Sequence, residues 1–118
     1  MPRRIIIVED EPIIALDIEQ ALVDAGCTVV GTAHTLKRAL DLVGSTTFDG
    51  AILDANLGSE SVRPIVEHLT AGGIPFLVVS GYSHDQLDFC EGSFPLVAKP
   101  FAMDVLIAAI QKHLVADR

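Results

Sequence analysis

The sequence predicts an α/β fold in which helices cover both faces of a five-stranded parallel sheet. Five short apolar or β-branched runs alternate with longer segments whose apolar residues recur at helical spacing. This alternation favours parallel strands joined by right-handed crossovers. The strand runs are apolar almost throughout, as is typical of strands buried on both faces. We therefore expect one doubly wound domain, residues 1–118, with its strands in the order 2-1-3-4-5.

The strands and the first helix are marked by clear signals. The strands are expected at residues 4–8, 27–32, 49–53, 75–79 and 94–98. The first helix is predicted from Pro12 to about Ala25, because proline favours the first helical turn and Gly26 is a stop signal. One face of this helix carries its apolar residues, which are Ile14, Ile18, Ala21, Leu22 and Ala25.

The later helices differ in the strength of their pattern. Residues 35–44 and 62–73 are expected to form the second and third helices, and a glycine pair closes the third. The segment 83–93 has little apolar periodicity, so we expect its helix to be short or mobile. The last helix carries one apolar stripe, formed by Met103, Ile107, Ile110 and Leu114.

Composition excludes several classes of protein. No apolar stretch approaches the roughly 20 residues of a membrane span, and the start resembles no signal peptide, so we expect a cytoplasmic protein without a membrane partner. A net charge of −8 argues against direct nucleic acid binding, which needs clustered Lys and Arg. Cys27 and Cys90 form no CxxC pair and are expected to be reduced. The four histidines lack ligand spacing, which argues against zinc.

Polar side chains gather where the predicted strands end. In a doubly wound sheet the functional site lies outside the carboxyl ends of the strands, where the strand order reverses. Glu9 and Asp10 follow the first strand, and Asp54 ends the third. Ser80 and Lys99 end the fourth and fifth strands. The order 2-1-3-4-5 makes strands one and three neighbours, so the three acids should converge with Ser80 and Lys99 beside them.

This arrangement predicts phosphoryl chemistry. Each close pair of carboxylates costs on the order of 4 kcal/mol at an effective dielectric constant near 20, so a positive charge must offset the repulsion. Mg²⁺ suits such hard oxygen ligands, and Lys99 supplies a fixed charge. Asp54 is then a nucleophile toward phosphorus, while the Ser80 hydroxyl donates a hydrogen bond to the transferring group. The product would be an acyl phosphate on Asp54.

Four motifs in order carry a resemblance: "VEDEP" after the first strand, "LDANL", "VVSGY" and "AKPF". Along essentially the whole chain they resemble the receiver domain of two-component response regulators, a CheY-like, flavodoxin-like fold. The resemblance implies that Asp54 is the phosphoacceptor. It implies that Glu9 and Asp10 hold Mg²⁺ together with Asp54 and the backbone carbonyl of Asn56.

The same resemblance implies roles for residues around the phosphoacceptor. Ser80 would be the hydroxyl switch, and Lys99 would bind the phosphoryl group. The bond between Lys99 and Pro100 would be cis. Asn56 and Tyr82 would flank the path of the attacking water, so we predict that they tune the lifetime of the acyl phosphate.

The chain is further similar to the receiver subclass called FAT GUY, whose partners are kinases of the HWE or HisKA2 type. Residues 78–80 replace the Phe, Ala and Thr of that name. Leu96 stands where the family carries an aromatic residue that swings inward on activation. Without that residue, the signal must pass through Ser80, the loop at 81–82 and the weak fourth helix.

Other interpretations fit parts of the sequence. Acids before a helix often only suit its positive end, and the turn-like "NLGSES" could make Asn56 a simple turn former. A flavodoxin-like FMN binder needs phosphate donors where this chain has "EDEP", and an aspartyl phosphatase needs an acid where it has Asn56. A degenerate receiver, which binds proteins without being phosphorylated, is the serious alternative.

We expect a signalling domain that accepts a phosphoryl group on Asp54, with Mg²⁺, from a histidine kinase or a histidine phosphotransfer protein. It would be a switch and not a metabolic enzyme, with only autophosphorylation and autodephosphorylation activity. An output domain or a downstream protein is the expected further partner.

Overall fold

A computed structural model describes residues 2–81 and 94–116. Five parallel strands form one sheet in the order β2-β1-β3-β6-β7. They are β1 (Arg4–Val8), β2 (Thr28–Ala33), β3 (Gly50–Asp54), β6 (Phe76–Ser80) and β7 (Leu96–Ala98). A small antiparallel hairpin, β4 (Asn56–Leu57) with β5 (Glu60–Ser61), separates the third and fourth sheet strands in the chain. The predicted order 2-1-3-4-5 and the doubly wound fold are therefore confirmed.

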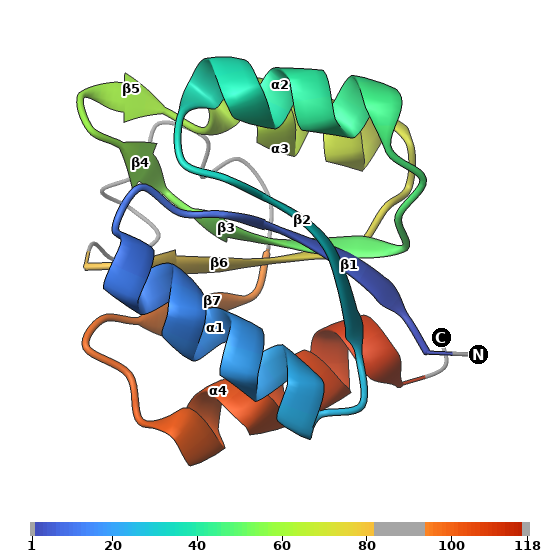
Figure 1. The fold of residues 1–118 in the computed structure, drawn as a ribbon, viewed down its shortest axis with the longest axis vertical. Helices are drawn as coiled ribbons and strands as arrows, with labels where there is room; N and C mark the ends of the chain where they lie inside the picture. The colour runs from blue at the N-terminus through green and yellow to red at the C-terminus, as the bar shows by residue number, and fades with distance from the viewer. Residues whose placement is uncertain (1, 82–93, 117–118) are drawn as a thin grey trace.

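Helices cover both faces of this sheet. They are α1 (Pro12–Asp24), α2 (Leu36–Ser45), α3 (Arg63–Ala71) and α4 (Met103–Ile110), which a π-helical turn continues over Gln111–Val115. Figure 1 shows α2 and α3 on one face of the sheet and α1 and α4 on the other. The first three helices begin and end within two residues of their predicted bounds. The helix predicted at 83–93, with Cys90, and the residue Tyr82 lie outside the described residues.

Strand β1 shows why the strand sequences are apolar at every position. Ile5 and Ile7 pack in the core under α1 and α4, whereas Ile6 and Val8 pack in the core under α2 and α3. All four side chains are fully buried. Successive side chains of a strand point to opposite faces, so a sheet covered on both sides needs apolar residues without alternation.

Local signals keep the acidic segment out of the helix that follows it. Pro12 occupies the first turn of α1, where its missing N–H costs nothing, and Glu11 has the extended backbone of a residue before a helix. The acids between β1 and α1 therefore stay in the connecting loop. Helix α2 begins differently, with a side-chain cap, since Thr35 Oγ1 accepts a hydrogen bond from the Arg38 N–H at 3.1 Å.

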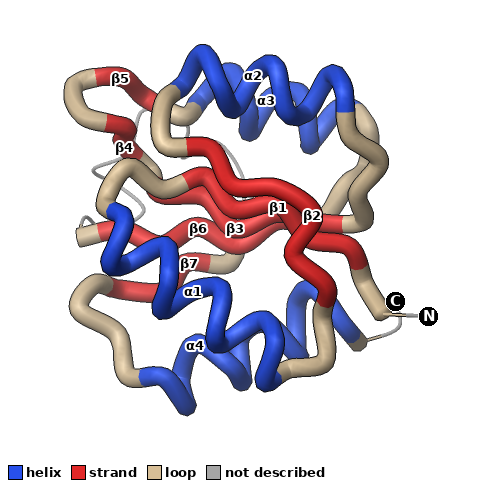
Figure 2. The backbone as a smooth tube through the Cα atoms, viewed as in Figure 1, coloured by secondary structure: helices blue, strands red, loops and turns tan. Residues whose placement is uncertain are grey.

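The β4–β5 hairpin lies beyond the carboxyl ends of the sheet strands (Figures 1 and 2). The sequence indicated only a turn here. Asn56 pairs with Ser61 and Leu57 pairs with Glu60, so each strand is two residues long. Leu57 is 5% exposed and belongs to the core under α2 and α3, which anchors the hairpin to the domain.

Candidate phosphoacceptor and metal site

Three carboxylates converge at the carboxyl ends of two neighbouring strands. Glu9 and Asp10 follow β1, Asp54 is the last residue of β3, and β1 pairs directly with β3. One carboxylate oxygen from each residue lies within 4.8 Å of the other two. The structure thus brings together the three acids that the sequence predicts as metal ligands.

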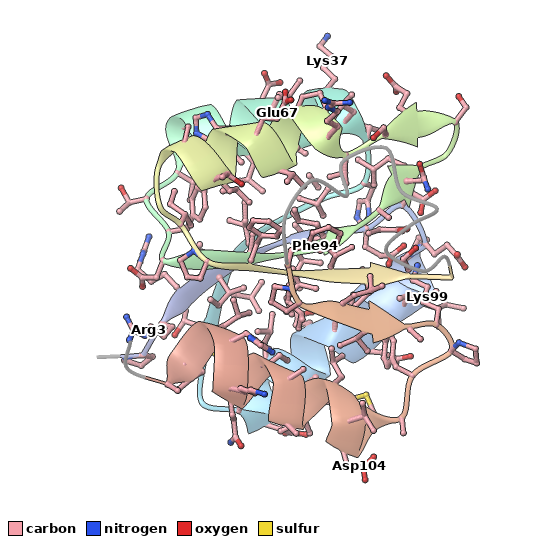
Figure 3. All side chains as sticks on the ribbon, turned by 180° about the vertical axis from the view of Figure 1, so that it is seen from behind. Arg3, Lys37, Glu67, Phe94, Lys99 and Asp104 are labelled. Carbon is pink, nitrogen blue, oxygen red and sulfur yellow. The ribbon has the colours of Figure 1, made fainter. Side chains whose placement is uncertain are left out.

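Lys99 lies against two of these acids. Its Nζ is 3.0 Å from Glu9 Oε1 and 3.2 Å from Asp54 Oδ2. Figure 3 shows Lys99 at the opposite end of the sheet from Arg3, which precedes β1. Burial alone would lower the pKa of Lys99, but the interactions with the carboxylates of Glu9 and Asp54 outweigh it and raise the pKa. Lys99 therefore remains a cation that offsets part of the repulsion.

The negative charge of Glu9 is the least well stabilised of the three carboxylates. Its side chain is fully buried, and its Oε2 accepts a hydrogen bond from the Glu11 N–H at 3.2 Å. Its Oε1 makes the ion pair with Lys99 but accepts no hydrogen bond from any described residue. Burial, and next the adjoining Asp54, raise the pKa of Glu9 to about 8. A buried carboxylate oxygen whose partner among the described residues is the Lys99 ammonium can take a further cation.

Backbone donors from the hairpin hold the other two carboxylates. Asp10 Oδ2 accepts a hydrogen bond from the Gly58 N–H at 2.9 Å, and Asp54 Oδ1 accepts one from the Asn56 N–H at 3.3 Å. Burial favours the neutral form of Asp10, but the hydrogen bond from Gly58 and those from neighbouring side chains outweigh it, so the pKa of Asp10 is lowered.

The remaining predicted residues lie around this cluster. Ser80 ends β6, is 2% exposed, and its carbonyl accepts a hydrogen bond from the Lys99 N–H at 2.8 Å. Asn56 opens β4 and is half-buried. The bond between Lys99 and Pro100 is cis, the isomer that the resemblance implies. Leu96, at the usual aromatic position, begins β7 and packs against the core under α2 and α3.

The sequence did not indicate two contacts made by Glu9 and Asp10. Gly58 was not singled out, although "NLG" does indicate a turn. His34 was not singled out either, but its Nδ1 lies 2.8 Å from the backbone carbonyl oxygen of Glu9. Because a carbonyl only accepts, this nitrogen must carry the hydrogen. His34 thus ties the loop after β2 to the loop after β1.

A hollow of about 360 Å³ adjoins Lys99 on the side of α1. It is lined by Glu11, Ile14, Asp17, Lys99, Pro100 and Phe101.

Within residues 2–81 and 94–116, no helix has the length and apolar character needed to cross a membrane.

Comparison with known proteins agrees with the geometry. The family model for the response regulator receiver domain matches residues 5–111. Among curated proteins, the phyllosphere-induced regulator PhyR of Methylorubrum extorquens is 31% identical over 121 residues, which cover 97% of this chain and 44% of PhyR. The chain spans about half the length of the curated relatives it matches.

Two solved structures match over nearly their whole length. The solution structure of SdrG from Sphingomonas melonis Fr1 is 42% identical, with a TM-score of 0.79 over 92% of this chain and 93% of that one. The BeF3-activated conformation of SdrG from Pseudomonas melonis Fr1 is 41% identical, with a TM-score of 0.75 over 96% of each chain.

Proposed function

Because the chain belongs to the family of response regulator receiver domains, we propose that Asp54 accepts a phosphoryl group from a phosphohistidine in a Mg²⁺-dependent reaction. The donor is a histidine kinase or a histidine phosphotransfer protein. The observation that carries the proposal is the convergence of Asp54 with two other carboxylates and Lys99. Such a cluster fits phosphoryl transfer, which needs a nucleophile and positive partners for the incoming negative charge.

In the proposed step, a carboxylate oxygen of Asp54 attacks phosphorus while the bond from phosphorus to the imidazole nitrogen breaks. The nitrogen keeps the electron pair, and the products are an acyl phosphate on Asp54 and an unmodified histidine. Lys99 Nζ, which lies 3.2 Å from Asp54 Oδ2, binds an oxygen of the phosphoryl group. The Ser80 hydroxyl donates a hydrogen bond to another oxygen.

Glu9, Asp10, Asp54 and the backbone carbonyl of Asn56 would hold the Mg²⁺. The donor set fits this cation, because it offers three carboxylates and because buried Glu9 Oε1 has, among the described residues, an ion pair with Lys99 but no hydrogen bond. Asp10 is partly exposed, which leaves access for the waters that Mg²⁺ usually keeps. When bound, the cation neutralises negative charge on the carboxylates and on the phosphoryl group.

The domain then works as a switch and not as a metabolic enzyme. Because Leu96 replaces the usual aromatic residue, the change passes through Ser80 and residues 81–82. A similar protein, SdrG, has a BeF3-activated conformation, and trifluoroberyllate resembles a phosphoryl group in charge and shape. We assign the chain to the FAT GUY subclass, with a kinase of the HWE or HisKA2 type as its partner and an output domain or downstream protein as its target.

Trifluoroberyllate tests the proposal without a partner. Titration of the ¹⁵N-labelled protein should give saturable shifts at the Asn56 and Lys99 amides only when Mg²⁺ is also present. Asp54→Asn should abolish these shifts, because the carboxylate that binds beryllium is gone. Asp41→Asn makes the same change at an exposed position of α2 and should leave them intact. Shifts that persist in Asp54→Asn, or that never appear in the wild type, would refute the proposal.

A further inference from the structure

The hairpin at 56–61 has a contact that the family resemblance does not explain, the 2.9 Å hydrogen bond from the Gly58 N–H to Asp10 Oδ2. We infer that Gly58 is a positioning residue whose N–H holds the Asp10 carboxylate in the cluster, ready for a divalent cation. The inference rests on the proposed function, because it takes Asp10 to be a metal ligand.

Asp10 is the carboxylate of the cluster with the most freedom to move. It is partly exposed, whereas Glu9 is fully buried and Asp54 is 7% exposed. Three carboxylates repel one another, and only Asp10 can turn toward water to relieve the repulsion. Lys99 makes ion pairs with Glu9 and Asp54, while Asp10 has no ion pair among the described residues. The Gly58 N–H is a backbone contact that opposes this movement, beside the hydrogen bonds from neighbouring side chains.

The Gly58 N–H is held rigidly by the hairpin. Leu57, next to Gly58, is buried in the core, and the pairing of Leu57 with Glu60 closes the hairpin around the turn. The Asn56 N–H of the same hairpin contacts Asp54 Oδ1. One short hairpin thus contacts two carboxylates of the cluster, and the domain core fixes its position. A donor held in this way reduces the ordering that Asp10 must undergo when it binds a cation.

The backbone at position 58 favours glycine. Gly58 has a φ of +64°, a conformation that strains other residues, yet nothing lies within 4 Å of the position of an added Cβ. Close packing is therefore not the reason for the glycine. Proline would remove the N–H and exclude the positive φ, so Gly58→Pro deletes the proposed contact.

The chain offers a matched control in Gly73. It has a φ of +68° and equally open space, and its N–H donates to the Thr70 carbonyl at 3.2 Å. It lies between α3 and β6, before the amino end of a sheet strand and away from the cluster. Gly73→Pro thus makes the same chemical change, with a similar loss of stability, without touching Asp10.

The first test is calorimetric titration of the wild type, Gly58→Pro and Gly73→Pro with Mg²⁺. We expect Gly58→Pro to bind Mg²⁺ roughly three- to tenfold more weakly, as the loss of one hydrogen bond to a charged group predicts. Gly73→Pro should stay within about twofold of the wild type. Unchanged or tighter binding by Gly58→Pro overturns the inference. A wild type that binds no Mg²⁺ overturns the proposed function instead.

The second test does not depend on the folding of the proline variant. Solvent exchange of the Gly58 amide is measured by NMR in the metal-free wild type, Asp10→Ala and Asp10→Asn. Exchange of the Gly58 amide should be roughly tenfold faster in Asp10→Ala than in the wild type. In Asp10→Asn it should be slower than in Asp10→Ala, because the asparagine carbonyl still accepts a hydrogen bond. The Gly73 amide should exchange equally in all three. A Gly58 amide that exchanges equally fast in the wild type and Asp10→Ala contradicts the inference.

Discussion

Replacing Glu9 with glutamine removes a buried charge from the metal-free cluster, and we expect the protein to become more stable. Burial, and next Asp54, raise the pKa of Glu9 from 4.5 to about 8. One pH unit corresponds to ~1.4 kcal/mol, so ionised Glu9 costs the folded state up to about 5 kcal/mol. This figure already includes the attraction to Lys99, which by itself lowers the pKa of Glu9. The buried amide of glutamine needs hydrogen-bond partners of its own, and this offsets part of the gain. We therefore expect a net gain of about 1 to 3 kcal/mol at pH 8.

The raised pKa of Glu9 also predicts how the free energy of unfolding depends on pH. The pKa of Glu9 is higher in the folded protein than in the unfolded chain, so between about 4.5 and about 8 the folded state binds more protons. The free energy of unfolding of the wild type should therefore fall as the pH rises through this window. Glu9→Gln lacks this dependence, so its advantage should be small near pH 5 and largest at pH 8 and above.

The assay is urea denaturation with chelator present, followed by far-UV circular dichroism, because the chain has one tyrosine and no tryptophan. Glu19→Gln, at an exposed position of α1, is the matched control and should change the free energy of unfolding by less than about 0.5 kcal/mol. The reasoning is refuted if Glu9→Gln is no more stable than the wild type at pH 8, or if its advantage is the same at pH 5.

Three other outcomes follow from the same cluster. Lys99→Met leaves Glu9 facing Asp54 without a cation, and should lower the free energy of unfolding in urea by about 2 to 3 kcal/mol; unchanged stability would show that the ion pairs contribute nothing. Mg²⁺ at ten times its Kd should raise the wild type's free energy of unfolding by about 1.4 kcal/mol, an effect that chelation reverses. Asn56→Ala and Tyr82→Ala should each change the decay rate of the acyl phosphate severalfold, measured by mass after donor removal; identical rates would exclude their role in hydrolysis.

The fold and the acidic cluster could be predicted because both depend on strong local patterns. Apolar runs such as residues 4–8 fill two cores at once, so they identify buried parallel strands. The topology then places the acids, because the carboxyl ends of parallel strands meet at one edge. A place at or just after the end of a strand was enough to predict the site residues Glu9, Asp10, Asp54 and Lys99.

Contacts between distant segments could not be predicted in this way. The hydrogen bond from Gly58 to Asp10 joins residues 48 apart, and that of His34 to the Glu9 carbonyl joins residues 25 apart. Neither leaves a periodic signal in the sequence. The β4–β5 hairpin was missed for a related reason, since strands of two residues are too short to show alternation.

The most direct test of the account is intact mass after incubation with Mg²⁺ and a small acyl-phosphate donor. A single phosphoryl adduct is expected, and it should disappear in Asp54→Asn and when Mg²⁺ is chelated. If the folded protein binds Mg²⁺ and still forms no adduct, the account is contradicted, and the chain is a degenerate receiver that binds its partners without phosphorylation.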